Sequence, residues 1–402
     1  MPAPEPTMPL HTLSRARTRA ARAATMLAAA GLAALAGCGD DFLVEKPSDF
    51  VSPVNFYQNA ADAQASINAA YATFLNLASP LGSSDYVGRN LWMLVEYPTE
   101  VTTSRLSAAN ERSLIGNFNP QFISSHPYLE TTWAAAYSGI NRANAVIERV
   151  PAIPMDTVRR NRIVGEAKFL RAVHYYWLAG LFGGVPLKLT ETQTITEPPL
   201  ARATAEQTWA QVTRDLTEAA AVLPTAWTGT DYGRATRGAA LTLLGKALLQ
   251  SAAMVPSLAA NNQRAIDVFR TVTTLGYQLD PNYASLFDGS NERSPEVIWS
   301  LQNVRVVGAG GTLTQWFVPV TSPAVFAPSQ QNQFQAERPF YDSYNASDVR
   351  RAGTWFTTLS VGTRTVNWAW TSGIQAATQY GSTGPVPRKF VDLGAAATGA
   401  EG

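Results

Sequence analysis

The sequence predicts a mainly α protein, with a helical first part and a loop-rich second part that carries short strands. Apolar residues recur at helical spacing in several segments between residues 59 and 276, and proline or glycine follows most of them. The composition changes after Gly276, where glycine, proline and aromatic residues become frequent. With 402 residues, 46% of them hydrophobic and 15% charged, the composition is globular, and the formal net charge of +1 argues against an electrostatic nucleic-acid binder.

The amino terminus has the layout of a secretory signal. Arginines between Arg15 and Arg22 form a positive region, and the apolar run Met26–Ala36 is too short to span a bilayer, which takes roughly 20 residues. Leu35-Ala36-Gly37-Cys38 resembles the bacterial lipobox, which implies cleavage before Cys38 and acylation of that residue. We therefore expect a lipoprotein signal peptide over residues 1–37. An ordinary signal peptide with an incidental cysteine is the alternative.

Residues 38–54 are predicted to form an extended tether. Cys38 is the only cysteine, so neither a disulfide nor a second thiol is available. Asp40 and Asp41 follow it after one glycine. They are either part of a solvated tether or a surface-export signal, because acidic residues after the lipid cysteine resemble that signal in Bacteroidota-type lipoproteins.

Residues 55–275 are predicted to form a tetratricopeptide-like helical region. Helical spacing of apolar residues predicts helices over about 59–77, 129–151, 158–181, 204–223, 236–253 and 262–276. Thr204 and Gln207 have capping-box spacing, Thr236 is a further expected cap, and Gly183 ends the third helix. Helix pairs that recur every 30 to 45 residues indicate a degenerate helical repeat.

The helix predicted over residues 158–181 has two stripes of similar residues. Ile163, Ala167, Leu170, His174 and Trp177 form an apolar seam, from which we expect His174 to be a hydrogen-bonded core residue. Gly165, Ala172 and Ala179 recur at intervals of seven, which permits close approach of a neighbouring helix.

Residues 276–402 are predicted to be loop-rich, with a short strand at Val297–Leu301. Gly308, Gly310 and Gly311 lack the strand-then-helix setting of a phosphate loop, so a flexible turn is expected there.

Nine stretches, in the expected order, resemble the SusD/RagB family of surface glycan-binding lipoproteins. The stretches are DDFLVEKPSDF, NFYQNAADAQASINAAYATF, TTWAAAYSGINRANAVIERV, GEAKFLRAVHYYWLAGLFGGVPLKL, TAEQTWAQVTRDLTEAAAVLP, GRATRGAALTLLGKALL, YASLFDGSNERSPEVIWSLQ, FYDSYNASDVRRAGTW and PRKFVD. They cover most of residues 38–392. The family normally continues with further helices, so the resemblance implies that the carboxy-terminal region is incomplete here.

The resemblance implies a SusD-like fold and a non-enzymatic role. A lipid-anchored, surface-exposed protein of the outer membrane would capture an oligosaccharide and deliver it to a SusC-like, TonB-dependent transporter. No cofactor or metal is implied, and no nucleophile elbow, Walker loop or metal-ligand spacing is present in the sequence.

Two clusters join aromatic and polar residues in the way that sugar binding requires, because sugar rings stack on aromatic faces while hydroxyls take hydrogen bonds. The family's ligand-stacking aromatics tend to come from comparable places. The candidate ligand-binding residues are Arg89, Asn90, Trp92 and Tyr97 in the first cluster and Trp316 and Phe317 in the second. Trp355, Trp368 and Trp370 are weaker candidates, and simple packing is the competing interpretation of each aromatic.

Two other classes of function compete with glycan binding. A tetratricopeptide-like scaffold would bind a protein. A surface glycosidase needs two carboxyl groups on either side of the bond, for which Glu96 and Glu100 are the best pair, although Pro98 breaks any helix that would align them. His126 precedes Pro127 in an expected loop and has no partner visible in the sequence.

Overall fold

A computed structural model describes residues 56–74, 86–104, 111–116, 118–194, 197–287, 290–302, 334–361, 364–367 and 385–388. The chain separates into two units, Met1–Phe56 and Tyr57–Gly402. Everything below concerns the second unit. The predicted signal peptide, the tether and Cys38 lie outside the described residues.

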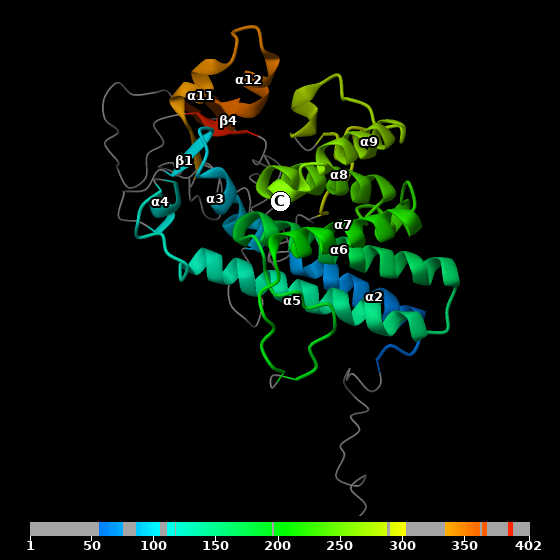
Figure 1. Cartoon of the computed structure of the whole chain (residues 1–402). Coiled ribbons are helices and arrows are strands. Elements are labelled where there is room, and N and C mark those ends of the chain that lie inside the picture. The colour runs from blue at the N-terminus through cyan, green and yellow to red at the C-terminus, as the bar shows by residue number, and fades with distance from the viewer. Residues whose placement is uncertain are drawn as a thin grey trace, which may run out of the picture. The chain divides into compact units, whose positions relative to one another are not determined.

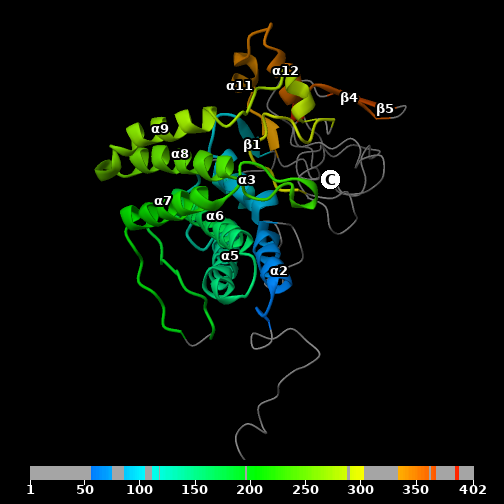
Figure 2. The ribbon, with the colours of Figure 1, turned by 90° about the vertical axis from the view of Figure 1, so that its right-hand side faces the viewer.

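Long helices that follow one another in the sequence also pack against one another. They are α5 (Pro127–Arg149), α6 (Thr157–Phe182), α7 (Ala205–Val222), α8 (Arg237–Met254) and α9 (Asn261–Thr273). Each contacts the next one along the chain, and α2 (Ala60–Tyr71) packs against both α5 and α6. Figures 1 and 2 show these helices in layers that follow the order of the chain. The mainly α class predicted from the sequence is confirmed.

Local signals in the sequence fix where these helices begin and end. At the start of α7 the Thr204 side chain accepts from the backbone N–H of Gln207, and the Gln207 side chain accepts from the N–H of Thr204, as predicted. Thr236 caps α8 in the expected way. Helix α6 ends at Phe182, and Gly183 follows with a φ of 73°, a conformation that glycine adopts without steric cost.

One continuous core runs through α2 and α5 to α9. The seam of α6 lies in it, with Ile163, Ala167, Leu170 and His174 fully buried and Trp177 packed against its margin. Trp209 of α7 is among the largest buried side chains. Since apolar burial stabilises by about 25 cal/mol per Å², this core is the principal stabilising element of the helical region.

A group of polar side chains inside this core forms a hydrogen-bonded network. Arg171 of α6 donates from Nε and Nη2 to the two carboxylate oxygens of Asp215 in α7, at 2.8 and 2.7 Å. Its Nη1 donates to Oδ1 of Asn144 in α5 at 2.9 Å. Asn144 in turn donates to the carbonyl oxygens of Lys188 and Thr190 at 3.0 and 2.9 Å. The group therefore joins three helices to the segment that leaves α6.

His174 is a hydrogen-bonded core residue, as predicted. Its two ring nitrogens lie 3.3 Å from the hydroxyls of Thr73 and Tyr86, and its ring stacks on that of Phe74 with centroids 4.4 Å apart. Burial lowers the pKa of His174 to about 3, so the imidazole is neutral at physiological pH. Gly139 of α5 provides the space, because a Cβ there would lie 2.0 Å from Nε2 of His174.

The part after Gly276 contains short elements. The described helices are α11 (Arg338–Ser343) and α12 (Val349–Thr354), at the top of Figure 1. The described strands form three antiparallel pairs: β1 (Thr102–Ser104) with β2 (Phe334–Ala336), β3 (Trp355–Phe356) with β6 (Val386–Pro387), and β4 (Thr358–Val361) with β5 (Arg364–Asn367).

The strand predicted at Val297–Leu301 is wrong. The segment is irregular, with a bend at Ile298, and pairs with none of the described strands. Trp299 instead packs edge-on against Phe169 of α6, with ring centroids 4.9 Å apart, and donates its indole N–H to the carbonyl oxygen of Gly233 at 2.9 Å. The apolar run thus attaches the segment to a helix and a loop rather than to a sheet.

Candidate functional site

The first predicted ligand cluster lies on two short helices, η3 (Tyr86–Asn90) and α3 (Leu91–Glu96). Asn90 is fully buried and donates from Nδ2 to the hydroxyl of Thr131 at 2.9 Å. Arg89 is half-buried. Its Nε donates to Oδ1 of Asn90 at 3.0 Å, and its guanidinium lies over the Tyr128 ring, 5.4 Å from the centroid. These contacts attach the segment to the start of α5.

Trp92 and Tyr97 take different positions on this segment. Tyr97 is 2% exposed and belongs to a small core with Met93, Leu94, Ile115 and Tyr128. Trp92 is partly exposed and packs against the outside of that core. Asn90 and Tyr97 therefore support the segment from within, whereas Arg89 and Trp92 retain surface that a ligand can reach.

The other predicted aromatic positions are separated from this cluster or cannot be placed. Trp316, Phe317, Trp368 and Trp370 lie outside the described residues. Trp355 is 5% exposed and packs among Ala336, Tyr341 and Phe340, so it is a core residue and the weak prediction of a ligand role for it is wrong.

Neither histidine of the described region has the surroundings of a catalytic group. His126 is buried and is the N-cap of α5, where its side chain accepts from the backbone N–H of Tyr128 at 3.3 Å. The sequence showed no partner for His126, and the structure supplies one, since a histidine side chain can cap a helix. Within the described ranges, no three His, Cys, Asp or Glu side chains gather to hold a metal ion.

Glu96 and Glu100, the predicted carboxylate pair, do not share a helix. Helix α3 ends at Glu96, and Pro98 lies in the turn that follows. The hydroxyls of Thr99 and Thr102 both donate to the carbonyl oxygen of Glu96, at 2.6 and 3.2 Å, which closes this turn.

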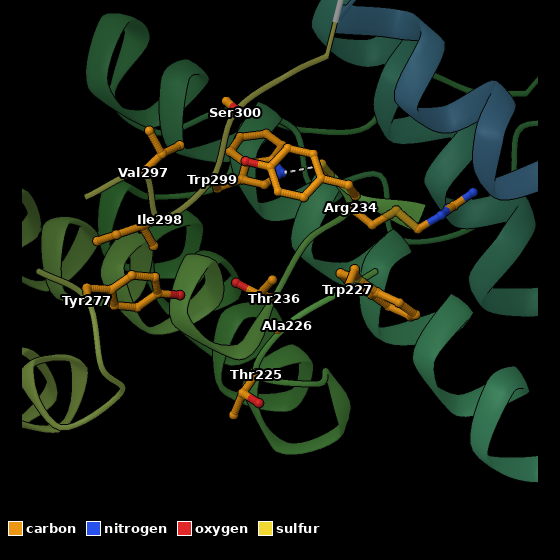
Figure 3. A pocket seen from close by; sticks show the side chains of 12 residues that line it. Thr225, Ala226, Trp227, Arg234, Thr236, Tyr277, Val297, Ile298, Trp299 and Ser300 are labelled. Carbon is orange, nitrogen blue, oxygen red and sulfur yellow. Dashed lines mark hydrogen bonds between the residues drawn. The ribbon is translucent and has the colours of Figure 1, made fainter. Parts of the chain in front are cut away.

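A pocket of about 130 Å³ lies where the segment 297–300 meets the connection between α7 and α8 (Figure 3). Four aromatic residues line the pocket: Trp227, Tyr232, Tyr277 and Trp299. The rest of the lining is Arg234, Thr236, Gly233 and five small or aliphatic residues. The indole N–H of Trp227 donates to the carbonyl oxygen of Ala235 at 2.8 Å. The pocket is smaller than the roughly 300–1,000 Å³ of pockets that enclose a whole small molecule. It can receive only a small group.

Arg234 fixes this pocket to the helical region. Its Nη1 donates to Oε2 of the buried Glu166 in α6 at 2.9 Å, and its Nε donates to Asp231 at 2.6 Å. Its third nitrogen donates to Oδ1 of Asn68 in α2 at 2.6 Å. Burial raises the pKa of Glu166, and the charge of Arg234 opposes that shift. Because all three nitrogens of Arg234 are engaged within the protein, we interpret the pocket as a structural joint.

Gly233 is required at this joint for two reasons. Its φ is 91°, a conformation that L side chains rarely adopt, and a Cβ there would lie 2.4 Å from Cγ of Gln302. In the sequence, residues 233–236 (GRAT) were noted only because they resemble a stretch of the SusD/RagB family. Nothing in the sequence indicated the contact between Arg234 and Glu166. Those two residues are 68 positions apart, so only the folded chain brings them together.

The fold defines a class of protein: helices stacked in chain order, with aromatic and polar side chains on short connecting elements beside them. Comparison with known proteins supplies the family. Residues 42–249 match the SusD-like family model described as "Starch-binding associating with outer membrane", which is half of the chain. The chain belongs to the SusD-like family.

Curated relatives agree with this assignment. SusD-like protein P2 of Formosa agariphila is 24% identical over 343 residues, which cover 82% of this chain and 63% of the relative. A SusD-like protein of Bacteroides ovatus is 25% identical over 66% of this chain and 47% of its own length. The chain thus spans only about half to three fifths of the length of these relatives.

Solved structures show the same fold. A laminarin-binding SusD-like protein has a TM-score of 0.66 and 23% identity, with 83% of this chain and 73% of that chain covered. A SusD homologue from Bacteroides thetaiotaomicron has a TM-score of 0.68 and 20% identity, with coverage of 86% and 70%. Surface glycan-binding protein A from Bacteroides fluxus has a TM-score of 0.64, 18% identity and coverage of 83% and 69%. The SusD-like fold predicted from the sequence is confirmed.

Proposed function

We propose that this chain is a non-catalytic glycan-binding lipoprotein of the outer membrane, which captures an oligosaccharide and passes it to a SusC-like, TonB-dependent transporter. The family match over residues 42–249 carries the proposal, because that family is described by starch binding and by association with the outer membrane. Among the described residues, no helix has the length and apolarity to cross a membrane. The proposed attachment is the lipid on Cys38, with residues 38–54 as the tether.

We place direct ligand contact at Arg89 and Trp92, together with Trp316 and Phe317. The partly exposed Trp92 supplies a ring face, and Arg89 supplies hydrogen-bond donors next to it. Asn90 and Tyr97 hold the segment in place. The core beneath the segment includes Tyr128 of α5, and Asn90 is hydrogen-bonded to Thr131 of the same helix. The segment is therefore held in place before a ligand arrives, which limits the entropy lost on binding.

Isothermal titration of the purified chain against a panel of neutral and acidic oligosaccharides tests the binding step. We expect heat with at least one glycan, and weaker binding in the Trp92→Ala and Trp316→Ala variants. Absence of heat with every glycan, alongside tight capture of a protein other than a transporter, would favour the scaffold function. Release of reducing sugar by the purified chain would favour hydrolysis, and Glu96→Gln and Glu100→Gln would show whether that pair performs it.

Co-purification from native membranes tests the transporter step. We expect a large β-barrel protein to accompany the chain, and a Cys38→Ala variant to lose membrane attachment. A chain recovered without a lipid and free of the membrane would contradict the proposed location.

A further inference from the structure

The loop between α4 (Glu111–Gly116) and α5 holds an aromatic residue in a conformation that aromatic residues avoid. Phe118 has a φ of 48°, in the left-handed region. The N–H of Phe118 donates to the carbonyl oxygen of Ile115, and the N–H of Asn119 donates to that of Leu114, at 3.3 and 3.1 Å. These two bonds are those of a Schellman motif, which places Phe118 at the position where glycine is usual.

Packing of the Phe118 ring does not compensate for the strain in its backbone. The residue is 74% exposed, and its ring stacks on no other ring among the residues that the structure describes. A bulky side chain in the left-handed region is strained, and glycine at this position would relieve that strain. Phe118 thus lowers stability through its backbone and gains almost nothing from burial. Strained residues of this kind cluster at binding and catalytic sites.

Phe118 lies beside the proposed ligand segment. Gly116, two residues earlier, lies against Tyr97, since a Cβ on it would lie 3.3 Å from the Tyr97 carbonyl oxygen. Ile115 before Phe118 and Phe122 after it pack in the same small core that carries Trp92. Figure 1 shows α4 next to α3 and β1. The Phe118 loop and the Trp92 helix therefore belong to one local body.

The surroundings of the ring fit a neutral ligand. Residues 114–129 contain no Asp, Glu, Lys or Arg, and their one histidine, His126, is buried. Asn119, the next residue in the chain, is partly exposed, and its Oδ1 accepts from the backbone N–H of Gln121 at 2.9 Å, which fixes its amide. An exposed aromatic ring on a stretch of chain that carries amides but no charged side chain matches the C–H faces and hydroxyls of an uncharged sugar.

We propose that the ring of Phe118 is a stacking platform for an uncharged sugar unit, at the edge of the ligand surface to which Trp92 contributes. This inference rests on the proposed glycan binding and adds a residue to it. The strain at Phe118 is then retained because glycine, which fits the backbone better, offers the sugar no ring.

Two measurements on the same variants test the proposal. In Phe118→Gly, we expect a higher melting temperature, because the strain is removed, and roughly two- to tenfold weaker binding of a neutral oligosaccharide, the range for the loss of one ring contact. Phe118→Tyr keeps the ring and should bind as the unchanged chain does. Ile123→Ala removes another exposed apolar side chain of the same loop, 58% exposed, and should leave binding unchanged.

Each contrary result has a distinct meaning. Unchanged affinity in Phe118→Gly, with weakened binding in Trp92→Ala, would overturn this inference and leave the proposed function standing. A lower melting temperature in Phe118→Gly would show that the ring stabilises the fold, which also overturns it. Loss of transporter capture with unchanged glycan affinity would assign the ring to a protein contact instead. No binding of any glycan by the unchanged chain would remove both proposals.

Discussion

The helical region and the body formed by α3 and α4 are built in opposite ways. From α5 to α9, one continuous core joins every helix, and the charged groups inside it are paired across helices, as Arg171 and Asp215 are. The α3 and α4 body has five buried apolar residues in its core and carries Phe118, exposed and strained, on its surface. One region buries its apolar seam in a large continuous core, whereas the other combines a small core with an exposed aromatic residue in a strained backbone conformation.

This difference is the one expected between a scaffold and a binding surface. Binding residues are more often found on loops and short elements that a rigid framework positions. Residues kept for binding are often poor for stability, so their replacement commonly stabilises a protein. The predictions below test whether the helical region is as rigid as its contacts imply.

The largest effect is expected at the buried ion pair of the helical region. Asp215→Ala leaves Arg171 charged and buried without its partner, and removal of one member of such a pair destabilises by roughly 3–5 kcal/mol. Chemical denaturation followed by circular dichroism measures this loss. The matched control is Asp267→Ala in α9, which breaks an exposed pair with Arg270, and its expected effect is below about 0.5 kcal/mol. Similar losses of unfolding free energy in the two variants would contradict the claim that the buried Arg171–Asp215 pair stabilises the helical region.

A smaller effect is expected from crowding between α5 and α6. In Gly139→Ala the new Cβ would meet the His174 ring, which is held between Phe74 and Tyr86, so the helices must separate. Overpacking of this kind typically costs about 1–3 kcal/mol. Gly180→Ala in α6 is the control, because its Cβ would meet only the end of the Gln250 side chain. That variant should be neutral or slightly more stable, since alanine favours helix by up to about 1 kcal/mol.

The last prediction concerns the loss of stability in acid that the lowered pKa of His174 causes; at neutral pH this effect is absent. Its pKa is about 3 in the folded chain against 6.5 for an ordinary histidine, so between these values the unfolded chain binds a proton that the folded chain does not. The contribution of His174 to stability is complete above pH 6.5 and falls with pH towards 3, by at most about 1.4 kcal/mol per pH unit. A His174→Gln variant should show a shallower decline of the unfolding free energy between pH 6.5 and 4.5. Parallel curves for the two proteins would contradict the lowered pKa.

Helices were predictable from the sequence because their signals are local. The predicted helix at 158–181 is observed at Thr157–Phe182, and that at 204–223 is observed at Ala205–Val222. Apolar spacing, the Thr204–Gln207 box and Gly183 lie within or beside the elements that they specify. The resemblance to the SusD/RagB family was also correct, since it rested on nine stretches in order.

Features that depend on distant contacts were not predictable in the same way. Val297–Leu301 was predicted as a short strand, but Trp299 contacts Phe169 and Gly233, which the sequence does not bring together. Asn90 and Tyr97 were grouped with Trp92 by composition, and only the small core shows that they face inward. Phe118 was missed because its significance lies in a backbone angle, for which the sequence offers no signal.

The central claim is that ligand binds on the α3 and α4 body while the helical region stays unchanged. Hydrogen-exchange mass spectrometry, with and without the oligosaccharide that gives the most heat in calorimetry, tests it most directly. The account predicts slower exchange in peptides that cover Leu91–Phe122 and no change in peptides from α6, α7 and α8. Protection confined to those helices, with none in Leu91–Phe122, would contradict it.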